Sequence, residues 1–169
     1  MSISLETMSE SLFLTHWMEL KEDSGTYMIR FVDEKNAIGD PHPRLLNILA
    51  TDISYPQLNS IQKIESLLPY PKLADVLSDL NNQYIRGGRW PVFTFGKRHA
   101  IAIERFIKAH RHEMQSLVIV CQYGQSRSYT SAEALSSTIK GLVVKKHHTA
   151  SGHSINKLIK QRLLTQLLK

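Results

Sequence analysis

The pattern of apolar and polar positions predicts three strands in the chain. Side chains alternate between apolar and other types from Tyr27 to Phe31, as they do in a strand with one buried face. Two short, nearly continuous apolar runs, LLNILA at 45–50 and SLVIV at 116–120, are typical of strands that are buried on both faces. The second run leads directly into Cys121, so we expect this residue at the end of a core strand.

The segments between and after these strands have the spacing of amphipathic helices. From residue 97 to 114, apolar residues recur on one helical face. Helices are also expected at 129–140 and at 154–169, the last with Ser154 as its N-cap. Residues 58–85 predict two further helical pieces, because two prolines interrupt the pattern between them.

The N-terminal segment predicts a helix that precedes the first of these strands. Thr7 and Glu10 have the spacing of a capping box, and apolar residues follow at roughly helical intervals up to about Lys21. We therefore expect residues 1–24 to form a helical extension to a core at 27–168.

Alternating strands and helices predict an α/β fold, with a central and mostly parallel sheet flanked by helices. The 169 residues are about the length of one domain, and 42% hydrophobic with 21% charged residues is the composition of a globular protein. A chain of this length buries enough apolar surface to fold without disulfides. The whole chain, 1–169, is thus expected to form a single domain.

The net charge narrows the range of partners only slightly. The chain has 21 Lys and Arg against 15 Asp and Glu, which implies attraction to something anionic. The hypothesis that the protein binds nucleic acid rests on this charge alone, so nucleic acid is not a favoured partner. No apolar run reaches the roughly 20 residues of a membrane span, and the N-terminus lacks the basic and apolar regions of a signal peptide. We expect a soluble cytoplasmic protein, with export by a route without a cleaved signal left open.

The candidate chemistry begins at the single cysteine. Cys121 cannot form an internal disulfide, so its thiol is available for chemistry or for packing. A strand that ends, turns through six residues and becomes a helix aims backbone N–H groups into a concavity at the positive end of the helix. In this turn, Gly124 can adopt a backbone conformation closed to other residues, and Arg127 can place its guanidinium over the concavity. The pattern favours phosphate binding. The positive end of the helix and the nearby guanidinium also favour the thiolate form of the cysteine.

This stretch, CQYGQSRS, resembles the signature of the cysteine-dependent protein tyrosine and dual-specificity phosphatases: Cys, five residues, Arg, then Ser or Thr. It shares the family's frequent Gly three residues after the Cys. The resemblance is nearest to the small bacterial dual-specificity-like branch and extends over residues 27–168, where Asp52-Ile53, the 97–114 helix and Asn156 follow in the family's order. It implies a phosphatase-like fold with the catalytic loop between a strand and a helix, and no cofactor.

The resemblance also implies a role for each residue of the site. Cys121 would attack the phosphorus of a phosphorylated protein or another phosphomonoester, and Ser128 would donate a hydrogen bond to the thiol. Asp52 would protonate the departing oxygen and then activate water to hydrolyse the cysteinyl-phosphate. The phosphate would be held by the loop residues Gln122, Tyr123, Gly124, Gln125, Ser126 and Arg127.

The identity of the acid and two departures from the family pattern leave alternatives open. Asp52 is preferred because it follows a buried strand, where loops carrying catalytic groups leave an α/β sheet. The family usually has His before the cysteine, where this chain has Val120. The stretch at 55–95 is also longer than expected between the acid and the 97–114 helix. The competing acids are Asp40, Asp75 and Asp79.

Other functions fit the sequence less well. A catalytically weak phosphate-binding module would keep the loop and Arg127 but lack a working acid. A rhodanese-like sulfur transferase also uses a cysteine-led anion loop, but the Ser-Arg-Ser ending argues against it. The nearby residues His147, His148 and His153 have no cysteine or acidic partner at a recognisable spacing, so no metal site is expected. The oligomeric state is not indicated.

Overall fold

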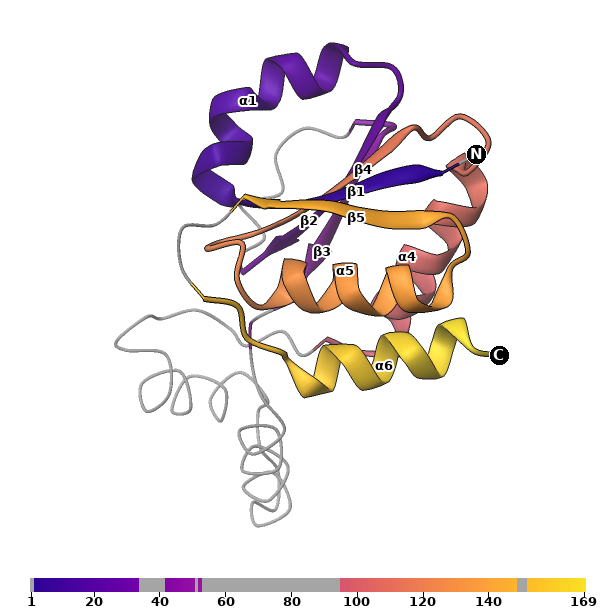
Figure 1. Cartoon of the computed structure of the whole chain (residues 1–169). Helices are drawn as coiled ribbons and strands as arrows, with labels where there is room; N and C mark the ends of the chain where they lie inside the picture. The colour runs from indigo at the N-terminus through magenta and orange to yellow at the C-terminus, as the bar shows by residue number, and fades with distance from the viewer. Residues whose placement is uncertain (1, 34–41, 51, 53–94, 149–151) are drawn as a thin grey trace, which may run out of the picture.

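Five parallel strands hydrogen-bond side by side in one sheet (Figure 1). The computed structural model describes residues 2–33, 42–50, 52, 95–148 and 152–169. The strand order is β3-β2-β4-β1-β5, so the first strand of the chain lies inside the sheet. The strands are β1 (Ile3–Ser9), β2 (Thr26–Val32), β3 (Leu45–Leu49), β4 (Ser116–Cys121) and β5 (Leu142–His148).

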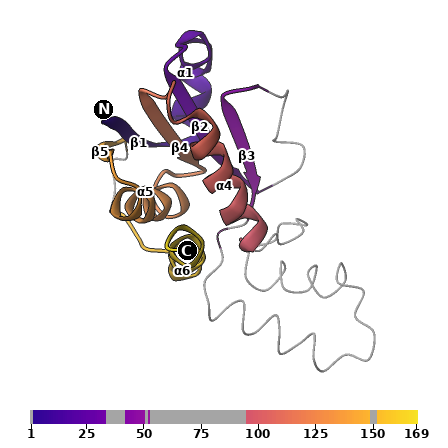
Figure 2. The ribbon, with the colours of Figure 1, turned by 90° about the vertical axis from the view of Figure 1, so that its right-hand side faces the viewer.

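Helices cover both faces of this sheet (Figures 1 and 2). On one face lies α1 (Glu10–Glu22), whose Phe13 is 2% exposed and packs on the sheet. On the other face lie α4 (Lys97–His110) and α5 (Arg127–Thr138). Behind them, α6 (Lys157–Leu167) packs against both helices. Among the described helices, none has the length and apolar content needed to cross a membrane.

The alternation of side chains along β4 divides the core between the two faces. Val118 and Val120 belong to the apolar cluster under α1. Ile119 and Cys121 belong to the larger cluster on the face that α4 and α5 cover. Because successive side chains of a strand point to opposite faces, the register of β4 places the thiol on the α5 side of the sheet.

The described residues confirm the predicted α/β domain with a parallel central sheet. The strands predicted around residues 27–31, 45–50 and 116–120 are present as β2, β3 and β4. Helix α5 follows the cysteine turn, as predicted, and α4 occupies most of the predicted 97–114 helix. The two helical pieces predicted within residues 58–85 lie outside the described residues.

The prediction of a helical N-terminal extension was wrong for residues 3–9, which form strand β1. Residues 1–24 are not a purely helical extension, because β1 pairs with β4 on one side and β5 on the other. The capping box does not form at Thr7, and the helix starts after Ser9, whose Oγ accepts a hydrogen bond from Leu12 N at 3.3 Å. Glu6 and Thr7 interrupt the apolar pattern and conceal the strand, although Thr7 is 0% exposed.

Two features near the C-terminus also differ from the sequence prediction. The edge strand β5 was not predicted. Val143, Lys145 and Lys146 of this strand are exposed, and the two lysines interrupt its apolar residues, so the segment lacks a long apolar run. The N-cap of α6 is Asn156 rather than Ser154, since Asn156 Oδ1 accepts a hydrogen bond from Ile159 N at 3.1 Å.

The carboxyl ends of the parallel strands lie together at one edge of the sheet. Asp33 directly follows β2, Ala50 and Asp52 follow β3, and the turn at 122–126 follows β4. In a parallel α/β sheet this edge is where ligands and catalytic groups are usually found. The fold thus brings together polar residues that are far apart in the sequence.

Candidate active site

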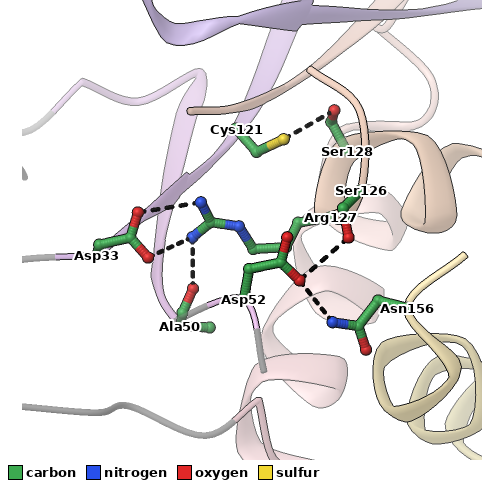
Figure 3. A network of polar contacts seen from close by, with 8 residues as sticks. All are labelled: Asp33, Ala50, Asp52, Cys121, Ser126, Arg127, Ser128 and Asn156. Carbon is green, nitrogen blue, oxygen red and sulfur yellow. Dashed lines mark hydrogen bonds and ion pairs between the residues drawn. The ribbon is translucent and has the colours of Figure 1, made fainter. Parts of the chain in front are cut away.

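Cys121 ends β4 with its thiol next to the first turn of α5. Its Sγ lies 3.2 Å from Ser128 Oγ, within hydrogen-bond distance (Figure 3). The cysteine is 2% exposed and Ser128 is 0% exposed. A hydroxyl in this position can donate to a sulfur anion, which is the role that the resemblance implies for Ser128.

The turn after Cys121 is fixed by hydrogen bonds through its carbonyl groups. Gly124 has a φ of 71°, and its N–H donates to Cys121 O at 3.2 Å, which reverses the chain direction. The carbonyl of Gln122 accepts from Glu10 N at 3.3 Å, and that of Gln125 accepts from Ser154 N at 3.1 Å. The turn is therefore held on two sides, by the start of α1 and by the segment before α6.

The backbone N–H groups of this turn remain largely open. Among the described residues, no protein acceptor is found for the amides of Gln122, Tyr123, Ser126 or Arg127. Helix α5 also begins without a side-chain cap, because Ser126 Oγ donates to Asp52 Oδ1 at 3.1 Å instead. Uncapped amides at the positive end of a helix favour an anion there.

Arg127 is buried and held by two acceptors on neighbouring strands. Its side chain is 3% exposed, and Nη1 donates to Asp33 Oδ1 and to Ala50 O, both at 2.7 Å. Nη2 donates to Asp33 Oδ2 at 3.0 Å. The ion pair is bidentate and involves the far end of the guanidinium (Figure 3).

This arrangement leaves one edge of the guanidinium with donors to spare. A guanidinium has five N–H groups, and three of those of Arg127 are engaged by Asp33 and Ala50. The remaining two are Nε–H and one proton of Nη2, which lie side by side. Nε is buried and has no partner among the described residues. In Figure 3 this edge faces the side on which Cys121 lies. A buried, unpartnered donor beside an open amide turn is suited to bind an oxyanion.

Asp52 lies beside the turn, as the sequence predicts for the acid. Its Oδ1 accepts from Ser126 Oγ at 3.1 Å and from Asn156 Nδ2 at 2.7 Å. The two donors converge on one oxygen, and no described residue donates to Oδ2. In Figure 3, Oδ2 points toward the side of the network where Cys121 lies. Oδ1 therefore fixes the side chain, and Oδ2 is the oxygen that these two hydrogen bonds leave open.

The structure adds Asp33, which the motif analysis did not identify. Its signal in the sequence is the one used for Asp52: an aspartate that directly follows a predicted strand. The structure also gives Asn156 a contact with the predicted acid, in addition to its place at the start of α6. The competing acids Asp40, Asp75 and Asp79 lie outside the described residues. Of the predicted loop residues, Gln122 and Tyr123 are exposed, Tyr123 at 67%.

An aromatic stack lies next to this turn. The ring of Tyr129 lies 4.8 Å from His147 and 4.3 Å from His153, between centroids. Burial lowers the pKa of His147, and the neighbouring His153 lowers it further, so the neutral ring is favoured. His148 is engaged by Glu6 Oε2 at 2.7 Å. No group of three metal-ligating side chains occurs within the described part of the chain.

Comparisons with protein-family models, with curated proteins and with solved structures find no match to this chain. Its chemistry must therefore be inferred from the geometry of the site. The relevant features are the thiol beside a hydroxyl, the open amide turn, the oriented guanidinium and the carboxylate at its rim.

Proposed function

We propose that the protein is a cysteine-dependent phosphomonoester hydrolase, of the protein tyrosine or dual-specificity phosphatase type. The observation that carries the proposal is the buried Nε–H edge of Arg127, which lies unpartnered beside the amide turn that starts at Cys121. These donors match the equatorial oxygens of a phosphoryl group, where charge must be stabilised during transfer.

The proposed reaction has two steps. In the first, Cys121 Sγ forms a bond to phosphorus as the bond to the substrate oxygen breaks, and Asp52 gives that oxygen its proton. In the second, Asp52 takes a proton from water, which attacks the cysteinyl-phosphate and releases inorganic phosphate. The Ser128 hydroxyl, 3.2 Å from the sulfur, would donate to the thiolate as it leaves.

A second candidate is a phosphate-binding module with little or no turnover. It is favoured by the position of Cys121 inside the apolar cluster under α5, which is also the setting of a structural cysteine. A module would use the turn and Arg127 in the same way, but the thiol would not react.

Turnover and anion binding together distinguish the two candidates. Hydrolysis of p-nitrophenyl phosphate should be measured for the wild type and for Cys121→Ser, with Arg127→Lys as a second variant that keeps charge but loses the two-donor edge. Arg111→Ala, at the C-terminal end of α4, serves as the arginine control, because among the described residues its guanidinium donates a hydrogen bond only to Lys140 O.

The enzyme predicts turnover that Cys121→Ser abolishes, Arg127→Lys strongly reduces and Arg111→Ala leaves unchanged. Binding of inorganic phosphate without turnover would instead support the module. A wild-type protein that neither hydrolyses the ester nor binds phosphate would contradict both candidates.

A further inference from the structure

The ion pair between Asp33 and Arg127 decides which edge of the guanidinium is left for a ligand. A guanidinium can meet a carboxylate either end-on, through Nη1 and Nη2, or side-on, through Nε and one Nη. Asp33 takes the end-on position, at 2.7 and 3.0 Å. The side-on edge, with the buried Nε–H, is therefore the edge that remains for an oxyanion.

The sheet itself fixes the two acceptors that hold Arg127. Asp33 is the first residue after β2, and Ala50 is the first after β3. The two strand ends are joined, because Ala50 N donates to Val32 O at 3.0 Å. The carboxylate of Asp33 and the carbonyl of Ala50 are thus held in a fixed relation by adjacent parallel strands.

We propose that Asp33 is a positioning residue, which orients Arg127 so that its Nε–H and Nη2–H edge faces the anion site beside Cys121. The inference rests on the proposed function, because it assigns Asp33 a role in binding the phosphoryl group. Asp33 itself contacts no reacting atom in this scheme. Its side chain is 34% exposed, so replacing it does not create a buried cavity.

Simple electrostatics and positioning predict opposite effects for the loss of this carboxylate. If Asp33 only reduced the positive charge of the site, removing its charge would strengthen anion binding. If Asp33 orients the guanidinium, its loss frees Arg127 to rotate, and anion binding becomes weaker. The direction of the change in phosphate affinity therefore separates the two roles.

The test uses the lone cysteine as a reporter that does not depend on turnover. The thiol is alkylated with iodoacetamide at increasing concentrations of inorganic phosphate, and the concentration that halves the alkylation rate is measured. We expect Asp33→Asn to raise this concentration about tenfold or more, the range for hydrogen bonds to charged groups. Asp23→Asn is the matched control, because Asp23 lies beyond the opposite end of β2 and bonds Thr26 Oγ1 at 2.6 Å.

Asp33→Glu separates geometry from charge, since it keeps the carboxylate but moves it by one methylene. We expect a half-protecting phosphate concentration between those of the wild type and Asp33→Asn. With p-nitrophenyl phosphate, both variants should raise KM as well as lower kcat, because Arg127 contacts the phosphoryl group in the ground state and the transition state. A cooperative thermal unfolding transition shows that each variant is folded. If Asp33→Asn does not fold, the test uses Asp33→Glu in its place.

The inference would be overturned if the phosphate concentration that halves alkylation of Asp33→Asn were equal to that of the wild type or lower. If only Asp33→Glu can be used, a concentration equal to that of the wild type would also overturn the inference. A wild-type protein that phosphate does not protect would instead refute the anion site and the proposed function. The failures of the inference and of the function are therefore distinguishable.

Discussion

Replacing Asp52 by asparagine separates proton transfer from the structural role of this side chain. In the structure, Oδ1 accepts both hydrogen bonds, from Ser126 Oγ and Asn156 Nδ2. Asparagine keeps an oxygen that can accept the same two bonds, so the start of α5 and the start of α6 stay connected. It replaces Oδ2 by an amide NH2 group, which cannot serve as an acid toward a leaving oxygen.

The size of the effect depends on how much the leaving group needs a proton. A positioned general acid contributes about 10²- to 10⁴-fold in rate, which is about 2.7–5.5 kcal/mol of activation free energy. Phenolate is a poor leaving group and p-nitrophenolate a good one. We therefore expect Asp52→Asn to lower kcat for phenyl phosphate about 10²-fold or more, and for p-nitrophenyl phosphate less than about tenfold.

The assay is a comparison of kcat for the two esters in the wild type and Asp52→Asn, with Asp23→Asn as the control. Phosphate protection of the cysteine should change little in either variant, because neither change touches Arg127. Equal losses for both esters would refute the assignment of Asp52 as the acid, and so would full activity with phenyl phosphate. A loss of phosphate protection would show that Asp52 acts by holding the turn.

Three further predictions test other contacts of the described residues. Ser128→Ala should slow hydrolysis of the cysteinyl-phosphate more than its formation, so rapid-quench kinetics should show a burst of phenol release that the wild type lacks. Phe13→Ala should lower the free energy of unfolding by about 3–5 kcal/mol in urea titrations, because the ring is 2% exposed, whereas Leu14→Ala, at a 58% exposed position, should cost less than about 0.5 kcal/mol. His99 Nδ1 accepts from Gly96 N at 3.0 Å, and burial, together with nearby arginines, lowers the pKa of His99 below 6.5. Its neutral form therefore stabilises the fold above that pH, and stability should fall as the pH drops below about 6.5, less steeply in His99→Gln.

The local part of the site could be predicted from sequence because it lies in one continuous stretch. The apolar run before Cys121, the glycine at 124 and the arginine at 127 together specify a strand, a tight turn and a helix. The backbone conformation of such a unit depends mainly on its own residues. Asp52 was predicted by a related rule, since a polar residue after a buried strand comes to the carboxyl edge of a parallel sheet.

The remaining features depend on the order of the strands, which the local pattern does not contain. Thr7 looks like a capping residue in the sequence, but it is buried in β1, and its Oγ1 lies 2.8 Å from His147 Nδ1, 140 residues away. The Asp33–Arg127 pair likewise joins positions 94 residues apart. Neither pairing follows from hydrophobic periodicity.

The strand order also explains why the loop sequence alone does not determine the orientation of Arg127. The loop determines the position of the Arg127 backbone. The orientation of its guanidinium depends on Asp33 and Ala50, which follow strands β2 and β3. A chain with the same loop and no acceptor at the end of β2 would hold the arginine less firmly, and its Nε–H would have no fixed direction. The orientation of the Arg127 guanidinium is therefore a property of three adjacent strands, of which β4 alone leads into the motif.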